Sequence, residues 1–140
     1  LTFSSSGSRD IYGSLSYTTG KFYTGNKNTV NIAANWKVFV RLFVGGSYNT
    51  NKVNLPDGSF SADILQFNLN LLFSPNITLY NYLQYDSKSK NAGLQTRFRW
   101  VLKPGNEILL VWNSGYIMPD ENLLMNENAL RFKLKYNIRF

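Results

Sequence analysis

The chain has 140 residues, with 15 Lys and Arg against 8 Asp and Glu, a formal charge of +7, and neither cysteine nor histidine. This length suits a single domain spanning residues 1–140. The missing cysteine and histidine exclude Ser-His-Asp and Cys-His catalysis, disulfides, and thiolate or imidazole metal sites. The longest mostly apolar run, Val38–Gly46, is far shorter than the ~20 residues of a membrane-spanning helix.

The first half of the chain contains four stretches that alternate apolar and polar residues with period two, as β-strands with one apolar face do. They are Asp10–Thr19, Thr29–Lys37, Phe39–Asn49 and Ser59–Phe73. In the last stretch, Phe67, Leu69 and Leu71 alternate with Gln66, Asn68 and Asn70. Asp10–Thr19 is the least regular of the four.

The second half contains four more candidate strands: Ile77–Asp86, Ala92–Leu102, Asn106–Gly115 and Leu130–Phe140. The last is the clearest, because its even positions are all apolar or aromatic and its odd positions are Arg, Lys or Asn. No segment shows an apolar stripe with the 3.6-residue period of a helix. The sequence therefore predicts eight strands and no helix.

The predicted connections alternate in length along the chain. Tight links are expected near Val38, at 74–76 and at 103–106. The second contains Pro and Asn and the third contains Pro, Gly and Asn, which are strong turn signals. Longer, polar connections are expected at 20–28, 50–58, 87–91 and 114–128. Short turns at one end and long loops at the other are typical of transmembrane up-and-down barrels.

Alternation alone does not distinguish a soluble barrel, with its apolar face inside, from a membrane barrel, with its apolar face outside. Predicted strands of 11 to 14 residues are long enough to cross a bilayer, which takes about 9–11 tilted residues. Aromatic residues near strand ends, as in the interfacial belts of membrane proteins, also favour the membrane class. They are Tyr17, Trp36, Tyr48, Phe73, Tyr85, Trp100, Tyr136 and Phe140.

The chain ends on an alternating apolar face formed by Tyr136, Ile138 and Phe140. This ending resembles the terminal-strand signal by which bacterial outer-membrane barrels are recognised for insertion. We therefore expect the barrel-assembly machinery to be one partner of the chain, and these three residues to be its assembly signal.

Basic residues gather on the predicted polar faces, where a membrane barrel has its lumen. The cluster comprises Lys37, Arg41, Arg97, Arg99, Arg131, Lys133 and Lys135. Either the lumen is wet and attracts anions, or these strands are the C-terminal part of a larger barrel whose other strands supply acidic groups. A third interpretation is that cations near strand ends extend their charged heads into water.

The connection 114–128 is rich in large apolar residues, namely Tyr116, Ile117, Met118, Leu123, Leu124 and Met125. Exposed patches of this kind often mark interaction sites. Three interpretations remain open: the flanking strands extend above the membrane as a hairpin, the loop docks on another outer-membrane protein or on outer-leaflet lipid, or the loop folds back over the lumen.

The middle of the chain resembles the C-terminal outer-membrane β-barrel region of a Bacteroidetes family. The resemblance rests on Phe22–Lys27, Asn51–Pro75, Gln84–Trp100 and Lys103–Asn113. In that family the barrel follows an N-terminal carbohydrate-binding family 9-like domain, which these 140 residues do not include. The resemblance therefore implies a barrel fold but no sugar-binding or catalytic residue.

The sequence as a whole predicts an all-β, antiparallel, eight-stranded transmembrane up-and-down β-barrel in the outer membrane of a Gram-negative bacterium. Its expected role is structural, as an anchor or assembly component surrounded by outer-membrane lipid and lipopolysaccharide. No paired carboxylates, phosphate loop or nucleophile elbow indicates catalysis, and no cofactor or metal ligand set is present. The alternatives are an anion-attracting pore and a soluble basic barrel that binds nucleic acid; we expect no nucleic-acid partner.

Overall fold

A computed structural model describes residues 1–56, 58–118 and 123–137. These residues form one antiparallel sheet of nine strands whose spatial order follows the chain. The strands are β1 (Thr2–Ser4), β2 (Ile11–Phe22), β3 (Gly25–Phe39), β4 (Leu42–Leu55), β5 (Gly58–Ser74), β6 (Ile77–Asp86), β7 (Asn91–Lys103), β8 (Asn106–Ile117) and β9 (Leu124–Lys135).

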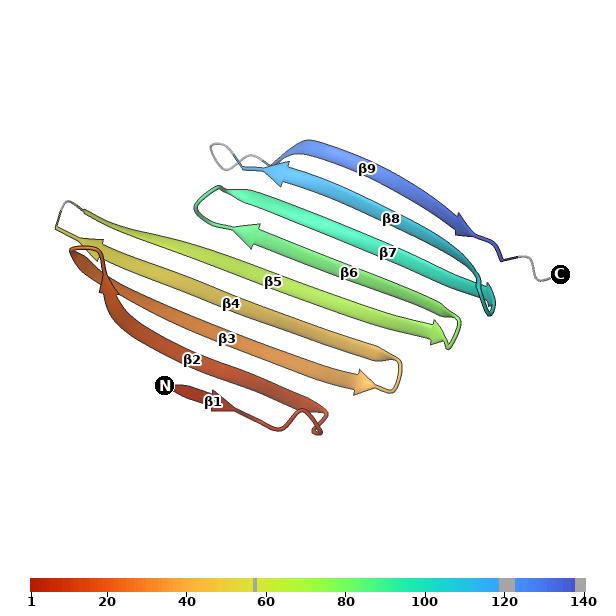
Figure 1. Ribbon diagram of the computed structural model, residues 1–140, viewed down its shortest axis with the longest axis horizontal. Coiled ribbons are helices and arrows are strands. Elements are labelled where there is room, and N and C mark those ends of the chain that lie inside the picture. The colour runs from red at the N-terminus through yellow and green to blue at the C-terminus, as the bar shows by residue number, and fades with distance from the viewer. Residues whose placement is uncertain (57, 119–122, 138–140) are drawn as a thin grey trace.

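The all-β, antiparallel up-and-down prediction is confirmed, and each of the eight predicted strands is present as one of β2 to β9. The structure adds β1, a strand too short to produce a periodic pattern. Figure 1 shows the strands side by side, with β1 and β9 at opposite edges. Within the described ranges these two edges do not pair, so the sheet is open. The described part of the chain contains no helix long and apolar enough to span a membrane.

Most strands are longer, and several connections shorter, than the sequence predicts; β6 has the predicted bounds, and β9 begins six residues earlier than predicted. β2 and β3 are joined through Tyr23 and Thr24 alone, and the connection after β6 spans Ser87–Lys90. The predicted connections 20–28 and 50–58 are therefore largely strand. Both stretches are mostly polar and lack the regular alternation that marks a half-buried strand. Their backbones nevertheless continue the hydrogen-bonded ladder.

The turns at 40–41, 75–76 and 104–105 lie together at one end of the sheet, called the right end after its position in Figure 1. Gly105 has a positive φ of 91°, which glycine adopts without strain. One prediction is wrong here: Arg41 lies in the turn between β3 and β4 instead of on the polar face of a strand. Its Nη1 donates a hydrogen bond to the Phe73 carbonyl oxygen at 3.3 Å.

The short edge strand β1 covers only part of β2. Thr2, Phe3 and Ser4 pair with Ser16, Leu15 and Ser14. Backbone hydrogen bonds from Tyr17 N to Leu1 O (2.8 Å) and from Ser5 N to Gly13 O (2.9 Å) extend the contact by one residue at each side. The outer edge of β2 beyond Tyr17 has no partner among the described residues.

Within the described residues, Val53 is the only apolar side chain that is fully buried, with 3% of its surface exposed. The described residues form a single sheet, and no second layer of secondary structure covers either face. The side chains therefore do not form a packed interior. The sheet is therefore held together mainly by the hydrogen bonds between neighbouring strands.

Glycine is required where β2 turns into β3. A Cβ at Gly25 would overlap the backbone carbonyl oxygen of Asn54 on β4, whereas a Cβ at Gly20 on β2 would meet nothing within 4 Å. We expect Gly25→Ala to lower the free energy of unfolding by about 1–3 kcal/mol, as overpacked sites do. Gly20→Ala, the matched control, should leave it unchanged or slightly raised. Urea titration measures both; equal effects would contradict the close approach of β3 and β4 at this point.

Candidate functional site

The strand register divides the side chains between two chemically different faces. One row of paired residues runs Ile11, Trp36, Val44, Leu69, Asn81, Thr96, Trp112, Leu130. The neighbouring row, on the opposite face, runs Lys37, Phe43, Asn70, Tyr80, Arg97, Val111, Arg131. We call the first the apolar face and the second the polar face. The predicted segregation of Phe67, Leu69 and Leu71 from Gln66 and Asn68 is confirmed.

The apolar face carries most of the large exposed side chains. In β9, Leu130, Phe132 and Leu134 are 72%, 62% and 56% exposed. In the central strands β3 to β5, Ile32, Trp36, Tyr48, Leu65 and Phe67 are exposed, while the alternating polar-face residues are mostly half-buried. Exposed apolar area on this scale indicates a surface that needs an apolar partner.

Aromatic residues bound the apolar face at both ends of the sheet. Near the right end lie Trp36 on β3, Phe73 on β5 and Trp100 on β7. Toward the opposite end lie Tyr17 on β2, Tyr48 on β4, Tyr85 on β6 and Tyr116 on β8. We call these the Trp/Phe girdle and the Tyr girdle. They place aromatic rings at two levels, with mostly aliphatic side chains between them.

Polar side chains interrupt the apolar face between the girdles at two paired positions, Asn81 with Thr96 and Ser114 with Asn128. Asn81 on β6 and Thr96 on β7 are directly paired, and Thr96 Oγ1 donates a hydrogen bond to Asn81 Oδ1 at 2.8 Å. The sequence shows Asn81 only as a break in the apolar pattern. Its pairing with Thr96 depends on the register, which the sequence does not reveal.

Amide and hydroxyl side chains on the polar face are linked across strands. Ser47 Oγ donates to Gln66 Oε1 (2.8 Å), and Gln66 Nε2 donates to Gln84 Oε1 (3.2 Å). A second chain joins Ser16, Asn31, Asn49, Asn51 and Thr29 across β2, β3 and β4. These bonds satisfy polar groups within the sheet, which favours a face that is enclosed in the functional state.

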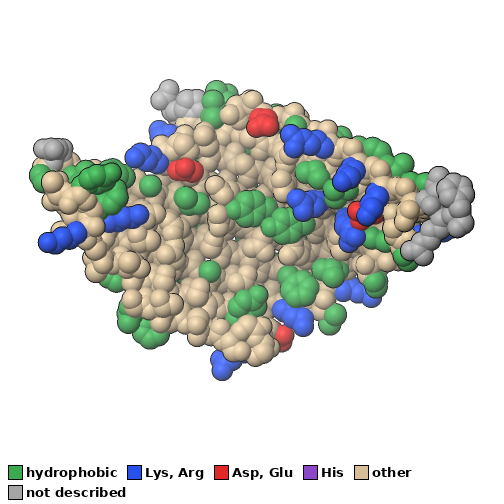
Figure 2. All heavy atoms as spheres, in the orientation of Figure 1, with side chains coloured by type: hydrophobic (Ala, Val, Ile, Leu, Met, Phe, Trp, Pro, Cys, Tyr) green, Lys and Arg blue, Asp and Glu red, His purple; other side chains and the backbone are tan. Residues whose placement is uncertain are grey.

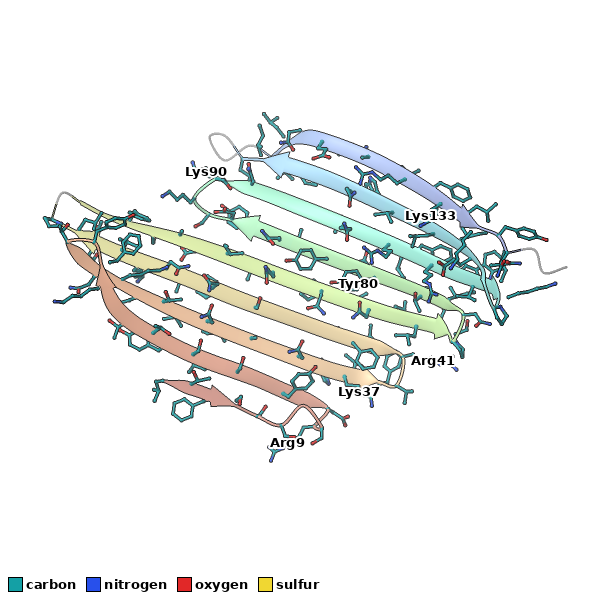
Figure 3. All side chains as sticks on the ribbon, in the orientation of Figure 1. Arg9, Lys37, Arg41, Tyr80, Lys90 and Lys133 are labelled. Carbon is teal, nitrogen blue, oxygen red and sulfur yellow. The ribbon has the colours of Figure 1, made fainter. Side chains whose placement is uncertain are left out.

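The predicted basic cluster divides into two parts. Arg97 and Arg99 on β7 and Arg131, Lys133 and Lys135 on β9 lie on the polar face on either side of β8; we call these five residues the basic patch. Lys37 shares the polar face but lies four strands away from β7, and Arg41 lies in its turn. Figure 3 shows Lys37 and Arg41 close to the β3–β4 turn and Lys133 toward the β9 edge of the sheet.

The basic patch is incompletely neutralised. Arg99 contacts Glu107 through Nε (2.9 Å) and Nη2 (2.8 Å), both to Oε2. The β8 residues between the other cations, Val111 and Leu109, are apolar. Figure 2 shows Lys and Arg side chains at both ends of the face in view, with the larger group toward the right, and a middle that carries few charged side chains. Such a surface attracts anions.

The other end of the polar face contains a cavity of about 520 Å³ over the paired glycines Gly93 and Gly115. Its lining includes the carboxylates of Asp86 and Glu127 and no Lys or Arg. Asp86 lies beyond the Tyr girdle, where the backbone N–H groups of Lys88 (2.9 Å) and Ser89 (3.3 Å) donate to its Oδ1 and lower the pKa of its carboxyl. These two carboxylates therefore lie at the end of the sheet opposite the basic patch.

Four residues of the predicted partner loop belong to strands. Tyr116 and Ile117 end β8 and pair with Met125 and Leu124, which begin β9. The flanking strands thus extend as a hairpin, and the loop predicted at 114–128 is correspondingly shorter. Tyr116 and Met125 lie on the apolar face and Ile117 and Leu124 on the polar face. Met118 N donates to Lys90 O at 2.9 Å, and Leu123 is 57% exposed.

The predicted assembly signal lies at the end of the described chain. Tyr136 follows β9 and is 69% exposed. Ile138 and Phe140 lie outside the described residues.

No group of three or more Asp, Glu, His or Cys residues in the described ranges could hold a metal ion. Comparison with protein-family models, with curated proteins and with solved structures finds no match to the chain. Functional inference therefore depends on the two faces, the girdles and the basic patch.

The two faces should respond differently to the same added charge. Leu69 and Asn68 are neighbours on β5 that lie on opposite faces. Leu69→Arg should lower the free energy of unfolding from a bilayer by about 2–4 kcal/mol, the cost of a cation at the lipid midplane of a barrel. Asn68→Arg, the matched control, should cost much less. Reversible urea unfolding in lipid vesicles measures both, and equal costs would contradict a lipid-facing Leu69.

Proposed function

We propose that this protein is an integral β-barrel of a Gram-negative outer membrane with a structural role, as an anchor or assembly component. The observation that carries the proposal is the inversion of exposure: large apolar side chains point outward uncovered, while amide and hydroxyl side chains bond one another on the opposite face. A water-soluble sheet would have to cover its apolar face. Lipid provides that cover without a second protein layer.

The height of the apolar face supports this proposal. On β5 the apolar residues extend from Leu65 to Phe73, about 27 Å along the strand at ~3.4 Å per residue. At a strand tilt of about 40° this corresponds to a vertical height of about 21 Å. The outward apolar band of outer-membrane barrels is ~25 Å tall. The strand segments of β2 to β5 beyond the Tyr girdle, which are mostly polar, would extend into water.

The aromatic girdles also support a location in a lipid bilayer. Tyr and Trp concentrate at membrane interfaces because their rings are apolar while their O–H or N–H group remains in contact with water or headgroups. Lipid and lipopolysaccharide are therefore the expected neighbours of the apolar face. The terminal residues Tyr136, Ile138 and Phe140 would engage the barrel-assembly machinery, and the resemblance to a Bacteroidetes barrel family is consistent with this assignment.

The three tryptophans provide a direct test, because Trp36, Trp100 and Trp112 all lie on the apolar face. In vesicles of brominated phosphatidylcholine we expect strong quenching of their fluorescence, with iodide in the water phase quenching weakly. Single-Trp variants should show deeper quenching for Trp112, which lies between the girdles, than for Trp100. Strong iodide quenching with no bromine effect would overturn the membrane assignment.

A second candidate function is an anion-attracting pore, favoured by the basic patch and its single described carboxylate partner, Glu107. Eight-stranded barrels are normally filled by side chains, so conduction requires a wet interior around these cations. The patch would then raise the local concentration of anions.

Conductance measurements separate the two candidates. If the structural role holds, single-channel recordings in planar bilayers should show no steady conductance in KCl. If the pore role holds, channels should be anion-selective, and Arg97→Gln with Lys133→Gln should lower that selectivity several-fold. Lys21→Gln, which removes a cation from the apolar-face side of β2, is the matched control and should have no effect.

A further inference from the structure

Two glycines lie side by side on the polar face of β7 and β8. Gln84, Gly93, Gly115 and Glu127 form one row of directly paired residues across β6 to β9. A Cβ at Gly93 would meet no atom of the described residues within 4 Å, so packing inside the sheet does not require glycine there. Glycine weakens a strand, and it often marks a place where a ligand approaches the backbone closely. The pair forms the floor of the cavity of about 520 Å³.

Hydrogen bonds fix the polar side chains beside this floor. Tyr82 Oη donates to Gln84 Oε1 at 2.8 Å, and Gln95 Nε2 donates to Asn113 Oδ1 at 2.9 Å. Each of the three amides has a second polar atom that a ligand can bind: Gln84 Nε2, Gln95 Oε1 and Asn113 Nδ2. Side chains that are oriented in advance lose little freedom on binding, which favours affinity. The cavity therefore has both the size and the polar groups of a small-molecule site.

The charge of the lining selects the class of ligand. Asp86 and Glu127 are the only charged residues among the described residues that line the cavity, and neither forms an ion pair with another of them. An anion would be repelled, and a neutral ligand would leave both carboxylates without a counter-charge. An ammonium group donates charge-assisted hydrogen bonds to a carboxylate, which are roughly twice as strong as neutral ones. The lining therefore favours a cationic ligand that carries primary amines.

The positions of the two carboxylates select the shape of the ligand. Asp86 lies on β6, two residues beyond Gln84, whereas Glu127 lies on β9. Three strand spacings of ~4.8 Å separate β6 from β9, so a single metal ion cannot contact both side chains. A linear molecule with an ammonium group at each end can reach both by crossing Gly93 and Gly115, because neither glycine has a side chain to block its path.

We propose that this cavity binds a linear polyamine, with ammonium groups at Asp86 and Glu127 and an aliphatic chain over Gly93 and Gly115. The inference goes beyond the proposed function. It uses only β6 to β9, so it does not depend on what pairs with the edges of the sheet.

The nearest cations of the chain do not occupy the cavity. Lys88 Nζ lies 4.0 Å from the centroid of the Phe60 ring on β5, a cation–π contact. Lys90 lies at the β6–β7 turn, as Figure 3 shows, and does not line the cavity. The basic patch lies at the opposite end of the polar face. A polyamine would therefore supply the positive charge that the lining lacks.

Isothermal titration calorimetry with spermidine tests the proposal on protein folded into phosphatidylcholine vesicles, whose neutral surface does not compete for the cation. We expect saturable binding at one site per chain, weakened by added KCl. Gly93→Leu, which fills the space above the floor, should lower the affinity about tenfold or more. Gly20→Leu is the matched control, because a Cβ there also meets no described atom within 4 Å, and it should leave the affinity unchanged. Glu127→Gln and Asp86→Asn keep side-chain size and should each weaken binding several-fold.

Three outcomes would overturn the polyamine site: no saturable heat with spermidine, equal losses in Gly93→Leu and Gly20→Leu, or unchanged affinity in both carboxylate variants. The carboxylate variants test the site even where Gly93→Leu does not fold. Neutral maltose and anionic citrate are titrated in the same way, and tighter binding of either would also overturn the cationic ligand class. Bromolipid quenching of the same samples tests the membrane assignment separately. Quenching without spermidine binding would reject this site while leaving the membrane assignment intact.

Discussion

The ladder of backbone hydrogen bonds between neighbouring strands is the interaction on which the rest of this structure depends. With Val53 as the only fully buried apolar side chain among the described residues, the sheet lacks the packed interior that stabilises ordinary domains. The ladder runs without interruption from β1 to β9 and fixes which residues share a face. Each strand contributes one apolar row and one polar row. Each face of the sheet is therefore stable only beside surroundings of matching polarity. Among the described residues, the ladder is present and no second layer covers the apolar face.

Much of the fold can be predicted from the sequence because period-two alternation depends only on which residues of a single strand lie on each face. β5 and β7 alternate cleanly through the apolar band, and their predicted limits differ from the observed ones by one residue at each end. β4 is different: beyond Tyr48 it continues as Asn49–Leu55, which is polar on both faces apart from Val53 and Leu55 and has the composition of a loop. Its strand character comes from pairing with β3 and β5, and that pairing is a tertiary property. The sequence alone places Arg41 on a strand, because the β3–β4 turn lies within an apolar run and no Pro or Gly marks it.

The sequence predicts which residues belong to the candidate site but not how they are arranged in space. Alternation shows that Arg97, Arg99, Arg131, Lys133 and Lys135 belong to polar faces, and register then brings β7 and β9 to either side of β8. Lys37 has the same alternation and lies elsewhere, because its strand is separated from β7 by three others. The Glu107 contact with Arg99 spans one strand pair diagonally, so it too requires the register. Pairings between strands, unlike the faces of single strands, are set by turn length and bulges.

The Asn81–Thr96 pair shows what a lipid environment, if the proposed membrane location holds, would demand of this sheet. These two polar side chains lie in the same row as Leu69, Trp112 and Leu130 on the apolar face, and they are the direct partners of each other. In water each could bond to solvent and no pairing would be needed. In lipid an unpaired hydroxyl or amide is costly, and the hydrogen bond from Thr96 to Asn81 removes part of that cost.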